Sequence, residues 1–110
     1  MTSTVDDLER FTAVLFAGRL LPTRLHRHMF TLPTEHVRML DGSSARHSMG
    51  LQTATVNGGT FWGKTGEQYG YNSGMFSTLD GQRRFAWSYT PVTGGPEQQR
   101  MTERIVTALT

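Results

Sequence analysis

The sequence predicts an α+β fold in which an antiparallel sheet of about four strands is flanked by N- and C-terminal helices. Three observations support this prediction. Apolar residues recur at three- and four-residue spacing near both ends of the chain, as they do on one face of a helix. Between them, strand-like runs are separated by the tight turn sequences Asn57-Gly58-Gly59 and Asp80-Gly81. With 110 residues and no internal repeat, residues 1–110 are expected to form a single domain.

The first helix is expected to begin within Ser3–Asp7. A hydroxyl cap precedes acidic residues there, and negative charge in the first turn favours the positive end of the helix dipole. Gly18 suits the C-terminal cap of this helix. Its apolar face comprises Val5, Leu8, Phe11 and Leu15.

A second helix is expected to start at Pro22, a residue that fits the first turn, and to end near Pro33. One face of it would carry Leu25, Met29 and Leu32. Residues 33–46 show no regular period and contain the turn-forming run Asp41-Gly42-Ser43-Ser44, so we interpret them as a loop.

Strand character begins after His47. The run Met49–Val56 and the returning run Thr60–Thr65 are expected to form a hairpin, followed by a loop at residues 66–70. A third strand is expected over Tyr71–Leu79 and a fourth over Arg83–Thr90. Alternation in the last strand places one set of aromatic residues on the same face, namely Phe85, Trp87 and Tyr89.

The segment Pro91–Pro96 is expected to break the fourth strand. Pro96 and Glu97 then open a last helix, whose apolar residues at four-residue spacing are Met101, Ile105 and Leu109. If both terminal helices cover the same face of the sheet, the other aromatic face needs a partner layer. The pattern therefore predicts self-association, with a homo-oligomer that buries this face.

The composition excludes several classes of protein. The absence of cysteine excludes a disulfide framework, a thiolate metal site and a cysteine nucleophile. No apolar run approaches the roughly 20 residues of a membrane helix, so no membrane span is expected. Asp6, Asp7 and Glu9 precede the apolar stretch Phe11–Leu21, where a signal peptide would carry positive charge. We therefore expect no export signal in this sequence, and the compartment stays open.

The charge pattern gives little support for nucleic-acid binding. Ten of the eleven basic residues are arginine, yet the net charge of +2 is a weak field for such a protein. One basic cluster could form a patch, but we interpret it as a solvated helix face. It comprises Arg19, Arg24, His26, Arg27, His28 and Arg38. The four histidines show no metal-ligand spacing, so neither a metal nor another cofactor is expected.

The tripeptide Lys64-Thr65-Gly66 at a strand end has the chemistry of a binding edge. The lysine offers a positive charge, the threonine a short hydroxyl, and the glycine lets another backbone approach closely. Such an edge can hold an anionic, peptide-like ligand by strand addition. The alternative is an ordinary strand that ends in an exposed lysine. Nearby Trp62, Tyr69 and Tyr71 could likewise wall a pocket or pack on the sheet.

The order of motifs along nearly the whole chain resembles the C-terminal part of serine β-lactamase-like, penicillin-recognising enzymes. The D-alanyl-D-alanine carboxypeptidases and the class C β-lactamase relatives are the members that it resembles in particular. Residues 1–11 resemble the family's G-M-x-S-T-x-x-D-L-x-x-F helix, residues 18–22 its G-x-L-L-P, and residues 47–51, in part, its Y-G-L-G-L strand. Residues 64–66 then match the [H/K]-T-G triad, and residues 70–73 its G-Y-x-S continuation.

The resemblance implies roles for several residues. Lys64 would be the catalytic cation that holds a substrate carboxylate and shapes proton transfer, and Thr65 would hydrogen-bond the same carboxylate. Gly66 would allow close approach, and the backbone N–H of Glu67 would be one of two oxyanion donors, each typically worth ~3 kcal/mol of barrier. Tyr71 and Asn72, in the continuation of the triad, would also contact substrate. The implied ligand is a peptide-like or β-lactam small molecule.

The sequence departs from the family in lacking the nucleophile. Those enzymes acylate the serine of a Ser-x-x-Lys motif, but Phe61 stands three residues before Lys64, which is the only lysine. Ser43-Ser44-Ala45-Arg46 is a poor substitute, because arginine does not act as a base near neutral pH. The family's Tyr-x-Asn or Ser-x-Asn motif is missing as well. By itself this chain is expected to be inactive in acyl transfer.

Three hypotheses follow. The first is that the chain is the C-terminal portion of a serine hydrolase, with an N-terminal half of the same enzyme as partner. The second is a non-catalytic binding or interaction protein that retained the sheet. The third is a truncation product without function.

Overall fold

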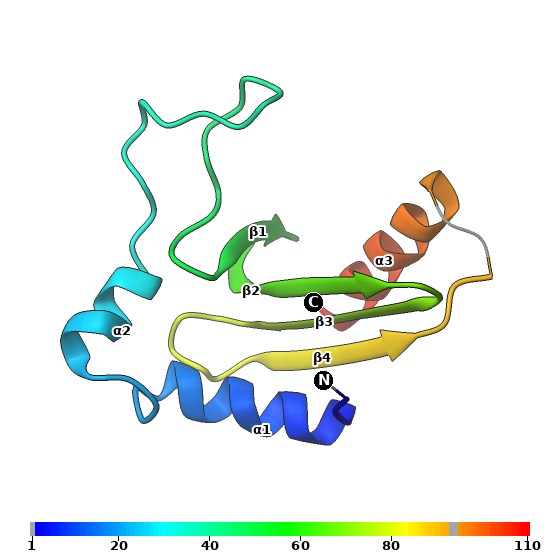
Figure 1. The fold of residues 1–110 in the computed structure, drawn as a ribbon, viewed down its shortest axis with the longest axis horizontal. Coiled ribbons are helices and arrows are strands. Elements are labelled where there is room, and N and C mark those ends of the chain that lie inside the picture. The colour runs from blue at the N-terminus through cyan, green and yellow to red at the C-terminus, as the bar shows by residue number, and fades with distance from the viewer. Residues whose placement is uncertain (1, 93–94) are drawn as a thin grey trace.

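The computed structural model describes residues 2–92 and 95–110. Met1, which opens the first motif of the resemblance, and residues 93 and 94 of the expected break lie outside the described residues. Three helices and a four-stranded antiparallel sheet form in the predicted order (Figure 1). The elements are α1 (Val5–Phe16), α2 (Thr23–Met29), β1 (Gln52–Val56), β2 (Gly59–Gln68), β3 (Tyr71–Ser77), β4 (Arg84–Tyr89) and α3 (Pro96–Leu109).

The predicted helix start is confirmed at Thr4. Its hydroxyl accepts a hydrogen bond from the backbone N–H of Asp7 (3.1 Å), which satisfies one of the free donors of the first turn of α1. Gly18, with φ of 76°, follows the end of this helix. The second helix is shorter than predicted, because α2 ends at Met29 and leaves Leu32 outside it.

The strands pair in the order β1-β2-β3-β4. Asn57 and Gly58 both have positive φ, 50° and 78°, as the two-residue turn between β1 and β2 requires. The strand predicted from Met49 begins only at Gln52, so Met49 lies outside the sheet. The third strand likewise ends at Ser77 rather than Leu79.

The loop predicted over residues 66–70 is wrong. Gly66, Glu67 and Gln68 continue β2 and pair with β3, and only Tyr69 and Gly70 form the turn. The physical reason is that Gly70 adopts φ of 78°, so two residues suffice to reverse the chain. Gly66, which we expected to begin the loop, therefore lies within β2.

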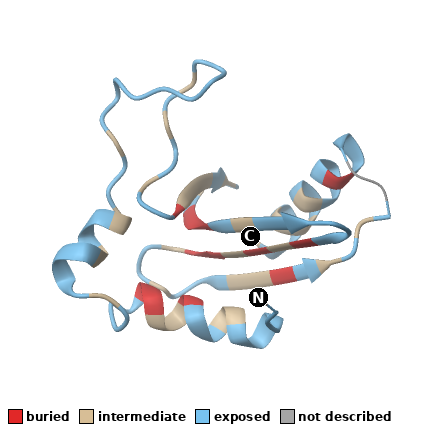
Figure 2. Ribbon diagram, viewed as in Figure 1, coloured by how far each residue is buried: buried red, intermediate tan, exposed pale blue. Residues whose placement is uncertain are grey.

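The terminal helices cover opposite faces of the sheet, which corrects the premise of one bare face. On the face that we call the α1 face, the buried cluster consists of Leu15, Phe16, Leu51 and Trp62. On the other, the α3 face, Phe61, Phe76 and Trp87 are buried, with Ile105 and Val106 of α3 packed against them. Figure 2 shows these buried positions concentrated along the strands and at the end of α1. Self-association therefore stays a prediction, but an uncovered sheet face no longer supports it.

The loop between α2 and β1 extends away from the sheet (Figure 1) and is largely exposed. Across residues 2–92 and 95–110, none of the helices has the length and apolar character required to cross a membrane.

Candidate functional site

One edge of the sheet is open beside the predicted triad. The β1–β2 ladder stops at the pair Gln52 and Gly63, whereas β2 continues to Gln68 and pairs there with β3 alone. Among the described residues, no strand pairs with the other side of residues 64–68, which we call the open edge. Backbone groups on such an edge can pair with another extended chain. That this edge binds a ligand stays a prediction.

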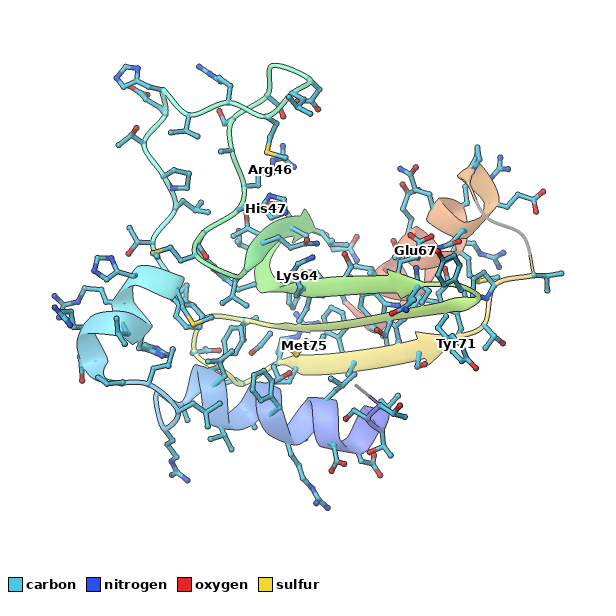
Figure 3. The ribbon with its side chains drawn as sticks, in the orientation of Figure 1. Arg46, His47, Lys64, Glu67, Tyr71 and Met75 are labelled. Atoms are coloured by element: carbon cyan, nitrogen blue, oxygen red, sulfur yellow. The ribbon has the colours of Figure 1, made fainter. Side chains whose placement is uncertain are left out.

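Lys64 begins the open edge and is exposed. Its register partner is Met75 on β3, and Figure 3 shows the two near the middle of their strands. The Nζ atom donates a hydrogen bond to the backbone carbonyl of Thr65 (3.0 Å). Within the described part of the chain, Lys64 forms no ion pair with a carboxylate. Its positive charge is therefore available to an anion that approaches the α1 face.

Thr65 lies on the opposite face from Lys64, because successive side chains of a strand alternate. Its register partner is Gly74, and its side chain lines a pocket beneath α3 together with Trp87. Lys64 and Thr65 are thus adjacent along the open edge but project to different sides of the sheet. Only a group that lies in the plane of the sheet, at the edge itself, can be approached by both.

Gly66 is the third residue of the open edge and is exposed. Its backbone conformation does not require glycine, since it is not among the residues with positive φ. A Cβ added there would meet only the Ser73 hydroxyl oxygen, at 3.2 Å. The edge is therefore free of side-chain bulk at this position, on the same face as Lys64.

The remaining predicted residues lie toward the β2–β3 turn. Glu67 is exposed on the open edge and pairs with Asn72. Asn72 is buried, and its Oδ1 accepts a hydrogen bond from Trp87 Nε1 (3.3 Å), so its side chain is engaged within the sheet. Tyr71 is exposed on the same face as Lys64, near the turn (Figure 3). Of the aromatic residues that flank the triad, Trp62 packs in the core, whereas Tyr69 is exposed.

Two further positive or titratable side chains lie near this corner of the sheet. His47 forms an antiparallel bridge with Gln52, and the Arg46 carbonyl accepts a hydrogen bond from Thr53 N–H (2.8 Å). Both side chains are exposed beside β1 (Figure 3). Two strand spacings separate His47 from Gly63, or about 10 Å. The sequence places Arg46 at the end of a loop and His47 at the start of a strand-like run. It does not predict their pairing with β1, because that pairing is a contact between segments.

Titratable groups do not gather into a metal site. Across the residues that the structure describes, no group of three or more histidine, aspartate or glutamate side chains could hold a metal ion. Hydrogen bonds from Ser43 and from Thr78 lower the pKa values of the Asp41 and Asp80 carboxyls, respectively. Asp41 lines a pocket with Arg46, His47 and Gln52.

Comparison with solved structures relates this fold to part of an enzyme. No protein-family model and no curated protein matches the chain. The structure is similar to that of a D-stereospecific amidohydrolase from Streptomyces sp., with a TM-score of 0.71 and 26% sequence identity. The similarity covers 90% of this chain and 28% of that one, so the chain spans little more than a quarter of the enzyme's length. The predicted fold class, an α+β unit with a partial β-lactamase-like architecture, is confirmed.

Proposed function

We propose that this chain supplies the substrate-binding edge of a serine hydrolase of the D-alanyl-D-alanine carboxypeptidase and β-lactamase type, and that the nucleophile comes from polypeptide outside this sequence. The observation that carries the proposal is the open edge, which begins at the unpaired cation of Lys64. The similarity to part of a D-stereospecific amidohydrolase supports it.

The ligand that fits this edge is a peptide-like or β-lactam small molecule with a terminal carboxylate. A carboxylate at the edge, in the plane of the sheet, would receive the Lys64 ammonium from the α1 face and the Thr65 hydroxyl from the α3 face. A hydrogen bond to a charged group contributes about 1.5–3 kcal/mol, so the ammonium alone is worth at least about tenfold in affinity. Gly66 would leave room for the ligand backbone, and the N–H of Glu67 would support an oxyanion.

The second candidate is a non-catalytic binding module with the same edge. The missing Ser-x-x-Lys motif favours it, because nothing in these 110 residues supplies the attacking serine and its lysine base. The two candidates differ in one measurement. A fluorescent penicillin should leave the isolated chain unlabelled in both cases, and labelling on addition of a serine-bearing N-terminal half would identify the hydrolase.

A titration tests the edge directly. N-acetyl-D-alanyl-D-alanine and its C-terminal amide are added to the ¹⁵N-labelled chain, and backbone N–H shifts are followed by NMR. We expect the free acid to bind about tenfold more tightly than the amide, with the largest shifts at residues 64–68. Lys64→Gln should remove this preference, while Lys64→Arg should keep most of it.

Arg104→Gln is the matched control for the loss of one positive charge. Arg104 is exposed on α3, which covers the face opposite to the Lys64 side chain. This variant should bind the free acid like the parent. Equal binding of acid and amide to the parent, or equal losses in Lys64→Gln and Arg104→Gln, would contradict the proposal.

A further inference from the structure

A pocket of about 270 Å³ lies between α3 and the sheet, on the face opposite to the Lys64 side chain. The pocket is partly open to solvent, so a small molecule can enter it from the surface. An apolar cavity of about 150 Å³ is large enough to take up benzene. The pocket therefore has room for an aromatic ring with a small substituent.

The walls of the pocket are aromatic on the sheet side. Phe76 and Trp87 are buried, and their rings are parallel within 3° at 5.8 Å between centroids. The Phe85 ring is inclined by 19° to that of Trp87 at 6.1 Å. The sheet side thus presents a series of stacked aromatic rings, which a further planar ring can join in an offset stack.

The helix side of the pocket supplies an aliphatic cover and a polar rim. Val106 of α3 lines the pocket and packs against the same core cluster, and Thr102 and Thr107 flank it. Of the described residues that line the pocket, Glu103 carries a carboxylate, and it is exposed at the rim. A negative charge at the mouth disfavours anions, and the largely apolar lining favours a neutral ring over a charged group of either sign.

The pocket also reaches the open edge. Gln52 and Thr65 both line it, and these residues flank the point where β1 begins and beyond which residues 64–68 of β2 pair with β3 alone. A ring in the pocket would therefore lie beside the Thr65 side chain.

We propose that the pocket between α3 and the sheet binds a single neutral aromatic ring. The proposal stands on the volume, the stacked aromatic wall and the aliphatic cover, and it does not require the edge to bind a carboxylate. The ring can belong to a free small molecule or to a side chain of a ligand that lies on the open edge. In both cases the chemistry that recognises it is the same.

The test uses p-cresol as the probe and 4-methylcyclohexanol as its non-planar counterpart. The two tryptophan indole N–H signals are followed by NMR. Trp87 lines the pocket, whereas Trp62 belongs to the cluster on the α1 face and serves as an internal reference. We expect saturable shifts at Trp87 with little change at Trp62, and tighter binding of p-cresol than of the cyclohexanol. Equal affinity for the two probes, or no saturable shift at Trp87, would overturn the proposal.

Two variants fill the pocket and one leaves it unchanged. Val106→Phe adds a ring from the helix side and should weaken p-cresol binding by about tenfold or more. Ala54→Leu fills the pocket from the sheet side. It serves as the test variant if circular dichroism shows that Val106→Phe does not fold. Met101→Phe adds the same ring at an exposed position of α3 outside the lining and should bind like the parent. If a folded Val106→Phe or Ala54→Leu variant binds p-cresol as tightly as the parent, the pocket is not the binding site.

A second arm identifies the source of the ring. N-acetylphenylalanine carries both a carboxylate and a ring, and Lys64→Gln removes the cation of the open edge. A loss of affinity for N-acetylphenylalanine but not for p-cresol in Lys64→Gln would assign the pocket to a side chain of an edge-bound ligand. Unchanged affinity for both would assign it to a free aromatic molecule. Failure of the edge proposal would therefore leave the p-cresol result intact.

Discussion

The indole ring of Trp87 lies directly over Gly74, its register partner across the β3–β4 pair. A Cβ placed on Gly74 would stand 2.3 Å from the Trp87 atoms Cη2 and Cζ2, well inside contact distance. Trp87 is buried, stacks on Phe76 and donates its Nε1 proton to Asn72. The missing side chain at position 74 thus lets a large ring lie flat on the sheet.

Gly74→Ala should therefore destabilise the fold. The methyl group cannot be accommodated without moving the Trp87 ring, and overpacking of this kind costs about 1–3 kcal/mol. Urea unfolding followed by tryptophan fluorescence would measure the loss in the free energy of unfolding. A change well below about 1 kcal/mol would show that Trp87 does not occupy this position.

The sequence was sufficient to predict the order of the elements, because that order depends on local signals. The Asn57-Gly58 turn is an example, since both residues adopt the positive φ that their types favour. The start of α1 at the Thr4 cap is another. These features need no information about distant parts of the chain.

The placement of the site residues could not be predicted in the same way. Whether Gly66 ends a strand or continues it depends on its pairing with Ser73, which is a contact between strands. Which of the two faces carries Lys64 and which carries Thr65 depends on how α1 and α3 pack on the sheet, and this too is a contact between distant segments. The pocket beneath α3 depends on where Val106 docks, and no pattern in the sequence fixes that distance.

Gly66→Ala should separate ligand binding from stability. The added methyl group would meet only the Ser73 hydroxyl oxygen at 3.2 Å, and this hydroxyl can rotate away. We expect a loss in the free energy of unfolding below about 1 kcal/mol. Affinity for N-acetyl-D-alanyl-D-alanine should fall severalfold in the same NMR titration, because the methyl group adds bulk at the open edge on the face that carries Lys64. A variant that binds like the parent would argue against close approach of a ligand at this residue.

The ion pair between Glu9 of α1 and Arg84 of β4 should contribute little to stability. Arg84 Nε lies 2.7 Å from Glu9 Oε1, but the two side chains remain 34% and 40% exposed. Half-exposed pairs of this type typically contribute about 0.2–1 kcal/mol. A double-mutant cycle with Glu9→Gln and Arg84→Gln, measured by urea unfolding, should give a coupling energy in this range. High salt should reduce it further.

Arg10→Gln is the control for that cycle. Arg10 lies 4.0 Å from Asp7, and its side chain is 79% exposed, so its pairing should be weaker still. A coupling energy between Glu9 and Arg84 of several kcal/mol would mean that the pair is more desolvated than its exposed fractions indicate.

The turn between β3 and β4 should make stability depend on pH in the acid range. Asp80 Oδ1 accepts hydrogen bonds from the Thr78 hydroxyl (2.6 Å) and from the Gln82 N–H (3.0 Å). The Thr78 hydrogen bond, and after it that of Gln82, holds the pKa of Asp80 below its ordinary value. The stabilisation is therefore complete above the unfolded-state pKa of about 3.9 and is lost as the pH falls through the folded-state pKa.

Asp80→Asn should accordingly lower the melting temperature at neutral pH and have a smaller effect at the acid end of the range. Thermal unfolding followed by circular dichroism at several pH values would measure both effects. Glu35→Gln, which removes an exposed carboxylate from the loop before β1, is the matched control for the change in net charge. If both variants show the same pH dependence, the hydrogen bonds of the turn are not its cause.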